Sequence, residues 1–302
     1  MTGYRASLGR IAAAVCLAVA LSAGTLDAVA LAAEPANLKL LTWNIQMLPT
    51  ALDFASADLQ KGQTLRAPWI VEHLNQCDYD VVVLQEVIDK KIAEQLCAGL
   101  KATYPHVVFA PAKLGLAGCS GGNLIVGRLP LKYVSHTVFK NITGVDKLAE
   151  KGCLVVETEI DGVHAQIIGA HLQAGNDKIN EAEYAEIRDG AVRPVTQSGV
   201  PQILAGDMNV AAGVPQFDRL LSTVEMAAFP LDDPNPFTVD GSNSWNKPNK
   251  RPKHIDHVLL NPRGTKSTVV RQTIQRARRE HQGRTVDLAD HYGVIAEIRI
   301  AK

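Results

Sequence analysis

The sequence predicts an α/β (α+β) protein in which two packed, mixed β-sheets are flanked by helices. Nine short apolar runs are bounded by Gly, Pro, Asp or Asn, which is typical of strands, and four other segments show helical periodicity. Strand-like runs therefore outnumber helices by about two to one, and several of them are consecutive. Because strands and helices alternate in a doubly wound parallel sheet, this order favours two sheets packed face to face.

The predicted strands are apolar runs rich in β-branched residues. They cover residues 38–43, 81–84, 107–110, 124–126, 154–156, 165–169, 203–205, 258–260 and 294–300.

Four segments repeat apolar residues at helical spacing. In the first, Leu65, Trp69, Ile70 and Leu74 share one face. The predicted helices cover residues 64–76, 89–103, 180–195 and 215–226. Residues 229–254 are rich in Pro, Asn, Asp and Ser and lack periodicity, so we expect a long loop that is either functional or disordered.

The composition is that of an ordinary globular protein. The chain has 302 residues, 46% apolar and 21% charged, with a formal net charge of zero. These values exclude disorder, collagen and coiled coil as descriptions of the whole chain. Zero net charge also argues against a chain that coats nucleic acid through overall basicity. No change in composition divides the chain into two domains.

The N-terminus has the order of a secretory signal peptide. Arg5 and Arg10 precede an uncharged apolar run at 11–22, and small-x-small triplets follow at 28–30 and 30–32. The run is shorter than the roughly 20 residues that span a bilayer. We therefore predict cleavage near Ala30–Ala32, a signal peptide at 1–32, a single domain at 33–302, and a secreted product, either extracellular or periplasmic.

The chain has five cysteines, and Cys16 lies in the predicted signal peptide. Export would therefore place the other four, an even number, in an oxidising compartment. Cys77 and Cys97 lie near the ends of two consecutive helical segments, so we favour a Cys77–Cys97 bond with Cys119–Cys153 as the remaining pair. Four free buried thiols are the alternative. Because the sequence contains no Cys-x-x-Cys spacing, a zinc site is not expected.

Polar side chains follow or precede the predicted strands where each strand ends. Four come directly after apolar runs, one lies two residues further on, and three precede the last two strands. They are Asn44, Glu86, His171, Asp207, Asn209, Asp256, Asp290 and His291. Sites in sheet proteins form where strand ends meet loops.

This set of side chains is suited to metal-assisted hydrolysis of a phosphate ester. Carboxylate and amide oxygens are the ligands that Mg²⁺ prefers, and a histidine backed by an aspartate can take a proton from water. Mn²⁺ and Co²⁺ are possible substitutes for Mg²⁺ as cofactor. The sequence has neither a Gly-x-Ser-x-Gly elbow nor a nucleotide-binding Gly-rich loop.

Four short motifs, in order, resemble the endonuclease/exonuclease/phosphatase superfamily: residues 41–44, 84–87, 206–209 and 289–291. Within that group, residues 163–174, 206–210, 104–105 and 151–152 are similar to bacterial secreted neutral sphingomyelinases (sphingomyelinase C), and His171-Leu172-Gln173-Ala174 is the most discriminating stretch. The resemblance covers essentially the whole mature chain. It implies a four-layer, deoxyribonuclease-like sandwich.

The resemblance also implies roles for the strand-end residues. Glu86 would hold the principal Mg²⁺ with help from Asn44, and Asp290 would touch a second metal. His291 would be the general base, oriented by Asp256. The remaining residues would contact water and phosphate: Asp207 and Asn209 would position both, and His171 would bind the phosphate or protonate the leaving alkoxide.

One stretch departs from the pattern of the family. The sphingomyelinases that attack membranes carry an aromatic-tipped hairpin before the final Asp-His, whereas residues 275–282 here contain no Trp or Phe. Residues 247–284 hold eleven Lys and Arg against two acids. This stretch predicts peripheral contact with an anionic membrane surface, with a nucleic-acid backbone or with the phosphate of the substrate, unless it is only a solvated loop and hairpin. Trp245 offers another interfacial contact.

We therefore expect a secreted, monomeric phosphodiesterase that hydrolyses sphingomyelin to ceramide and phosphocholine. Another Mg²⁺-dependent phosphoesterase on the same fold, a nuclease or a lipid or inositol phosphatase, is the first alternative, although a nucleic-acid partner is less expected. A non-enzymatic secreted binding protein is the second.

Overall fold

Two β-sheets pack face to face in the computed structural model, which describes residues 36–48, 57–110, 112 and 119–302. Residues 35–302 form one compact unit. The predicted signal peptide, residues 1–32, lies outside the described residues. Within the described part of the chain, no helix has the length and apolar character needed to cross a membrane.

The first sheet has six strands in the order β10-β13-β1-β2-β4-β3. Its central strands β1 and β2 are parallel, whereas β13 runs antiparallel to β1, so the first and last strands of the chain are neighbours. The strands are β1 (Ala36–Met47), β2 (Val81–Val87), β3 (His106–Phe109), β4 (Leu124–Gly127), β10 (Thr268–Gln275) and β13 (Gly293–Ile300).

The second sheet has five strands in the order β5-β6-β7-β8-β9. The pairs are antiparallel except β7 and β8, which are parallel. The strands are β5 (Lys132–Val138), β6 (Gly152–Ile160), β7 (Val163–His171), β8 (Gln202–Asp207) and β9 (Asp256–Asn261). A separate hairpin consists of β11 (Arg278–His281) and β12 (Arg284–Asp287).

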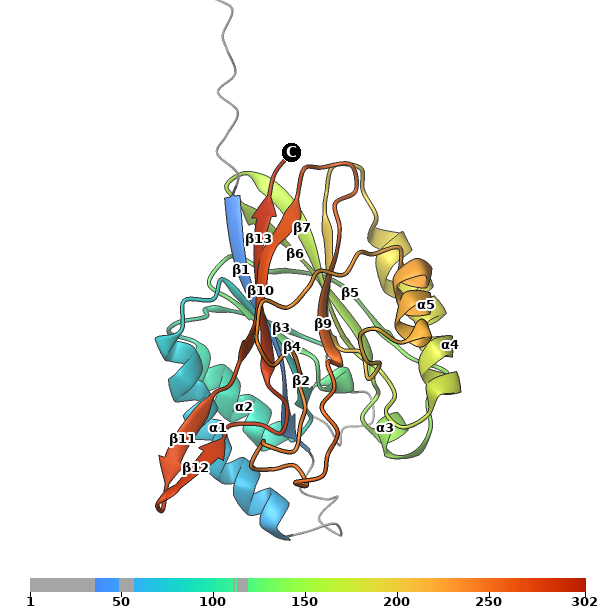
Figure 1. Cartoon of the computed structure of the whole chain (residues 1–302). Coiled ribbons are helices and arrows are strands. Elements are labelled where there is room, and N and C mark those ends of the chain that lie inside the picture. Colours follow the sequence, from blue (N-terminus) through green and yellow to red (C-terminus); the bar gives the residue numbers. More distant parts are fainter. Residues whose placement is uncertain (1–35, 49–56, 111, 113–118) are drawn as a thin grey trace, which may run out of the picture. The chain divides into compact units, whose positions relative to one another are not determined.

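Helices cover the outer faces of both sheets (Figure 1). Helices α1 (Ala57–Gln76) and α2 (Lys90–Leu100) share one apolar cluster with the first sheet, and α4 (Asp177–Ile187) and α5 (Pro215–Val224) share another with the second. A third cluster, which includes Leu40, Val83, Ile125, Leu154 and Ile167, fills the space between the sheets. The predicted four-layer sandwich is confirmed.

Short helical segments complete the connections. They are η2 (Ser120–Gly122), α3 (Gly144–Leu148), the π-helical turn η3 (Arg188–Val192) that continues α4, and η4 (Arg193–Val195).

The sequence analysis did not identify β5, β10 or the two hairpin strands. Both β5 and β10 are edge strands, and the residues of β5 are exposed or only partly buried. Because such strands carry polar residues on accessible faces, they lack the continuous apolar runs that reveal buried strands.

The predicted disulfide pairing is not found, because all four described cysteines are free. Cys119 packs in the cluster between the first sheet and α1 and α2, whereas Cys153 packs in the cluster beneath α4 and α5. The two thiols of the predicted Cys119–Cys153 bond therefore lie in different layers of the sandwich. Their separation along the sequence gave no sign of this. Cys77 and Cys97 border the same cluster without a bond between them.

Five arginines of the basic stretch at 247–284 are paired within the protein. The pairs are Arg263–Glu225, Arg271–Asp232, Arg276–Asp233, Arg278–Asp287 and Arg279–Glu72. Contact of this stretch with a membrane stays a prediction. It now depends on the six Lys and Arg side chains of the stretch that are outside these five pairs.

Trp245 is also committed to internal contacts. Its Nε1 donates to the Asp287 carbonyl at 2.6 Å, and the Arg66 guanidinium lies 4.9 Å from its ring centroid. A Cβ atom at Gly62 on α1 would lie 2.6 Å from the indole, so the ring packs directly on that helix. These contacts argue against Trp245 as a free interfacial anchor.

Gly206 on β8 is a point of close approach between strands. A Cβ atom at this position would lie 1.9 Å from the Ala170 carbonyl oxygen on β7. We expect Gly206→Ala to lower the free energy of unfolding by at least about 2 kcal/mol, because the backbone itself must move.

Gly213→Ala is the matched control for Gly206→Ala, since Gly213 has a positive φ of 79° but open space at its Cβ position. We expect that variant to lose only about 1 kcal/mol. Urea unfolding of both variants measures the difference, and equal losses would show that the close approach is unimportant.

Candidate active site

Strand register brings the predicted residues of the second sheet to one level. His171 on β7 is the register partner of Asp207 on β8, and Asp207 is the partner of Asp256 on β9. In the first sheet, Asn44 on β1 pairs with Gln85 on β2, which places Glu86 immediately beyond it. The polar ends of the central strands thus meet at one end of the sandwich.

The Asn44 amide joins the two sheets at this point. Its Nδ2 donates to Glu86 Oε1 at 3.1 Å and to Asp207 Oδ2 at 3.1 Å, and its Oδ1 accepts from the Gln46 backbone nitrogen. The amide nitrogen of Asn44 faces the carboxylates, whereas a metal would be bound by the amide oxygen. Asn44 could therefore bind a metal there only if its amide were rotated by half a turn. In this structure it bridges two acids instead.

His291 and Asp256 form a buried hydrogen-bonded pair. The Nδ1 of His291 lies 2.9 Å from Asp256 Oδ2 and 3.9 Å from Asp207 Oδ2. Burial alone would lower the pKa of His291, but the negative charges of Asp256, Asp290 and Asp207 raise it to about 10. The pair leaves Nε2 as the ring nitrogen available to a water molecule.

His171 differs from His291 in its electrostatic surroundings. Its Nε2 lies 3.7 Å from both Glu86 Oε1 and Asp207 Oδ2, and neither ring nitrogen has a hydrogen-bond partner among the described residues. Burial holds the pKa of His171 well below its usual value, and the nearby Lys151 and His291 lower it further. The ring is therefore neutral, and its two nitrogens are buried and unpaired among the described residues.

The carboxylates at this end of the sandwich are crowded. Burial raises the pKa of Glu86 to about 7, and the charge of Asp290 adds to this effect. Burial and the charge of Asp256 also raise the pKa of Asp207. Lys151 is a buried cation that opposes these shifts, and it is held by the Leu172 carbonyl at 2.9 Å and Asp146 at 3.2 Å.

These donors fit a hard divalent cation. Glu86 and Asp290 repel each other electrostatically, and Asp290 Oδ1 is buried without a partner among the described residues. Oxygen ligands with uncompensated negative charge are what such ions require. Asp207, Asp256 and His291 also place one ligand atom each within 4.8 Å of one another. We assign that group to acid–base chemistry because Asp256 is already bonded to His291.

Asn209 makes two hydrogen bonds that fix the ends of β7 and β8. Its backbone nitrogen donates to Asp207 Oδ1 at 2.9 Å, and its Nδ2 donates to the Leu172 carbonyl at 3.0 Å. Asn209, Glu86 and Gln46 all have positive φ values, of 52°, 58° and 51°. Non-glycine residues rarely adopt this conformation, and such residues cluster at functional sites.

The segment before β13 is held by side chains that the sequence analysis missed. The carbonyls of four consecutive residues, 288–291, each accept a hydrogen bond from a side chain. The donors are Arg66 to Leu288 at 2.8 Å, Asn243 to Ala289 at 2.9 Å, Asn246 to Asp290 at 2.9 Å and Trp43 to His291 at 2.9 Å.

Two of these donors, Asn243 and Asn246, lie in the long loop whose role the sequence left open. The same loop supplies Thr238, whose Oγ1 accepts from the backbone nitrogens of Ile255 and Asp256. The loop therefore positions both members of the His291–Asp256 pair, and its polar composition reflects the hydrogen bonds it makes.

Comparison with known proteins shows consistent similarity along most of the chain. The model of the endonuclease/exonuclease/phosphatase family matches residues 41–291. A phospholipase C of Staphylococcus aureus is 28% identical over 249 residues, which are 75% of this chain and 74% of the relative. A sphingomyelinase C of Bacillus cereus is 23% identical over 301 residues, which are 87% of this chain and 89% of the relative.

Solved structures share the fold. The beta toxin 275–280 structure from Staphylococcus aureus has a TM-score of 0.71 at 25% identity, over 86% of this chain and 99% of that one. Sphingomyelinase C from Streptomyces griseocarneus has the same TM-score at 23% identity, with the same coverage of both chains.

The His291–Asp256 pair makes stability depend on pH in a defined direction. The folded pKa of His291, about 10, exceeds its unfolded value of about 6.5, so the pair stabilises the fold fully below pH 6.5. That stabilisation is lost as the pH rises toward 10. We expect Asp256→Asn to lower the free energy of unfolding most at pH 6 and progressively less up to pH 10. Denaturant unfolding in the presence of chelator measures this difference, and a constant difference would contradict the assignment.

Arg66 is the buried cation that holds this end of the fold together. Its guanidinium donates to the carbonyls of Ile45, Gln46 and Leu288 at 2.8–3.0 Å. We expect Arg66→Met to lower the free energy of unfolding by about 2–4 kcal/mol, because three carbonyls lose their donor.

Arg219→Met is the control for Arg66→Met, since Arg219 forms an exposed pair with Glu181, and solvent-exposed ion pairs contribute little to stability. Thermal or urea unfolding of both variants distinguishes the two contributions. Similar losses would show that the Arg66 contacts contribute no more than a surface ion pair.

Proposed function

The chain belongs to the endonuclease/exonuclease/phosphatase family, and on that premise we propose that it is a metal-dependent phosphoric diester hydrolase that converts sphingomyelin to ceramide and phosphocholine. The observation that carries this proposal is the buried His291–Asp256 pair at hydrogen-bond distance, beside Asp207, which the Asn44 amide links to Glu86. The relatives named phospholipase C and sphingomyelinase C support the substrate class.

In the proposed reaction, His291 acts as the general base. Asp256 occupies Nδ1, which leaves Nε2 to accept a proton from the water that attacks phosphorus. Asp207 is fixed through both of its oxygens, by Asn44 and by the Asn209 backbone, so it keeps its position as the water is deprotonated.

His171 is suited to hydrogen bonding with a phosphate oxygen. Its ring is neutral and both nitrogens are free of partners among the described residues. A histidine with a strongly lowered pKa holds few protons at neutral pH, so this environment favours phosphate contact over protonation of the leaving alkoxide.

Glu86 and Asp290 would hold the divalent cation. A cation held there would supply positive charge for the phosphate and the departing alkoxide, and it would lower the pKa of His291 by offsetting the charge of Asp290. A beta toxin structure with bound magnesium ions shares this fold, which supports Mg²⁺ as the ion.

Secretion is also part of this proposal. The charged, apolar and small-residue order of residues 1–32 supports it.

The critical test is a parallel assay of the purified protein on sphingomyelin liposomes, duplex DNA and a generic phosphodiester, with Mg²⁺ and with chelator. We expect phosphocholine release that chelator abolishes. Cleavage of DNA alone would overturn the substrate assignment, and activity insensitive to chelator would overturn the metal mechanism.

His291→Ala should lower turnover on sphingomyelin by about 10²–10⁴-fold, because general base catalysis contributes that much. His164→Ala is the control, since His164 has an exposed side chain on β7 and should retain wild-type activity. Circular dichroism verifies that both variants fold. A His291→Ala variant with more than half of wild-type activity at saturating Mg²⁺ would remove His291 from the mechanism.

A further inference from the structure

Four cations of the basic stretch gather in one short part of the long loop, residues 247–253, which we call the cationic segment. They are Lys247, Lys250, Arg251 and Lys253, and no acid occurs between residues 241 and 255. The five ion pairs of the basic stretch all involve arginines further along the chain. The four cations of the segment form no ion pair with any residue that the structure describes, so their positive charge is not neutralised locally.

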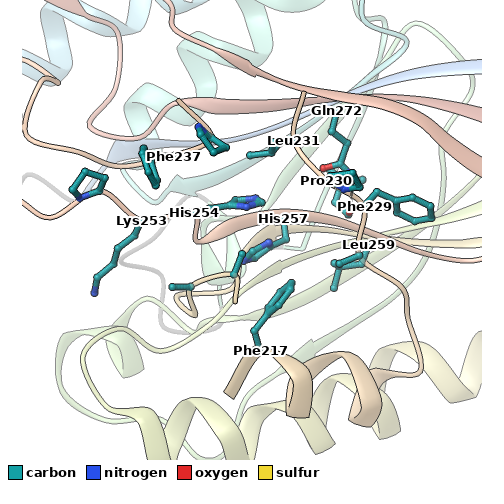
Figure 2. Close-up of a pocket in the computed structure, with 16 residues that line it drawn as sticks. Phe217, Phe229, Pro230, Leu231, Phe237, Lys253, His254, His257, Leu259 and Gln272 are labelled. Atoms are coloured by element: carbon teal, nitrogen blue, oxygen red, sulfur yellow. Dashed lines mark hydrogen bonds between the residues drawn. The ribbon is translucent and has the colours of Figure 1, made fainter. Parts of the chain in front are cut away.

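The side chains of the cationic segment are accessible to solvent. Lys247, Arg251 and Lys253 are exposed, and Lys250 is partly buried. Lys253 borders a cavity beside β9, but Figure 2 shows its amine pointing away from the other side chains that line this cavity. The charge of Lys253 therefore faces outward, as a contact surface requires.

The backbone of the loop that carries the segment is held in a defined shape before any partner binds. Val239 and Lys253 exchange both backbone hydrogen bonds of an antiparallel bridge, at 2.9 and 3.1 Å. Within this bridge, a Cβ atom at Gly241 would lie 2.3 Å from the Pro248 carbonyl oxygen, so the two arms of the loop are in close contact. Because the loop is ordered in advance, binding a surface through its side chains costs less conformational entropy.

The cationic segment is connected to the active site by two hydrogen bonds. The Lys250 amine donates to Asn246 Oδ1 at 2.9 Å, and Asn246 Nδ2 donates to the Asp290 carbonyl at 2.9 Å. Asp290 is one of the two residues that would hold the divalent cation in the proposed reaction. A surface bound by the segment would therefore meet the end of the sandwich that carries the active site.

We propose that the cationic segment binds the surface of a bilayer that contains anionic phospholipid and thereby holds the active site against its lipid substrate. This inference rests on the proposed function, to which it adds the partner surface. Each Lys or Arg side chain near an anionic bilayer is attracted by its negative surface potential, and the attractions of clustered cations add. Because the chain as a whole has zero net charge, this attraction is local and orients the protein on the surface.

A bilayer fits the segment better than duplex DNA does. Proteins that hold a duplex neutralise phosphates along its length, which requires cations spread over a surface or groove. Here Arg276, Arg278 and Arg279, which lead into the hairpin, are each paired with an acid, so these three do not extend the segment. A bilayer, in contrast, can be bound through a single cluster of cations.

Co-sedimentation of the purified protein with vesicles that lack sphingomyelin tests the proposal. We expect tighter binding to phosphatidylcholine vesicles that contain phosphatidylglycerol than to vesicles of phosphatidylcholine alone, and loss of this preference at high salt. The triple variant Lys247→Gln, Arg251→Gln and Lys253→Gln should weaken binding about 100-fold, because each removed charge contributes about five-fold. Lys250 is left in place because its amine donates to Asn246.

The matched control removes three exposed cations from the opposite end of the sandwich, with the same change in net charge. This variant combines Lys266→Gln, Arg299→Gln and Lys302→Gln, at the end of the first sheet where β1 begins. It should bind the anionic vesicles as the wild type does. Urea unfolding verifies that both triple variants fold.

Equal affinity for the two kinds of vesicle would overturn the proposal, as would equal weakening by the two triple variants, because the effect would then be one of net charge. Binding of duplex DNA that the first triple variant abolishes, without binding of vesicles, would assign the segment to nucleic acid instead. Because the vesicles contain no sphingomyelin, their binding is measured apart from hydrolysis. Failure of this proposal is therefore distinguishable from failure of the proposed function.

Discussion

The amide of Asn44 donates at once to Glu86, near the end of the neighbouring strand, and to Asp207 in the opposite sheet. Two sheets that otherwise meet through an apolar core must here hold acidic groups together away from bulk water. Buried like charges repel strongly in a medium of low dielectric constant, and the raised pKa values of Glu86 and Asp207 reflect this. Three groups reduce this repulsion: the Asn44 amide, which donates to both acids, and the positive charges of Lys151 and His291.

The backbone around these acids is fixed by side chains more than by regular structure. Asn180 of α4 is fully buried and donates to the carbonyls of Gln173 and Met208, which follow the strands that carry His171 and Asp207. Glu183, one turn later, accepts from the Gln173 nitrogen. The long loop and Arg66 act in the same way on the segment that carries His291. Rigid placement of catalytic groups by surrounding hydrogen bonds is a general requirement of active sites.

The sequence predicted the residues that end strands, because a polar residue after an apolar run is visible locally. Parallel pairing of β1 with β2 and of β7 with β8 then brings Asn44, Glu86, His171 and Asp207 together. Their supporting residues were not predictable, since Arg66 and Asn243 act on carbonyls 222 and 46 residues away along the chain. The role of the arginines near the hairpin was missed for the same reason, because their acidic partners lie in other segments.

The pairing of β1 with β13 has a consequence for how the protein is made. The central strand of the first sheet has no antiparallel neighbour on one side until residues 293–300 have been synthesised. Contacts between such distant parts of a chain form late and slowly. A nascent chain on the ribosome therefore cannot complete its core or bring His291 to Asp207. Both the first sheet and the active site are complete only after the last strand of the chain has been made.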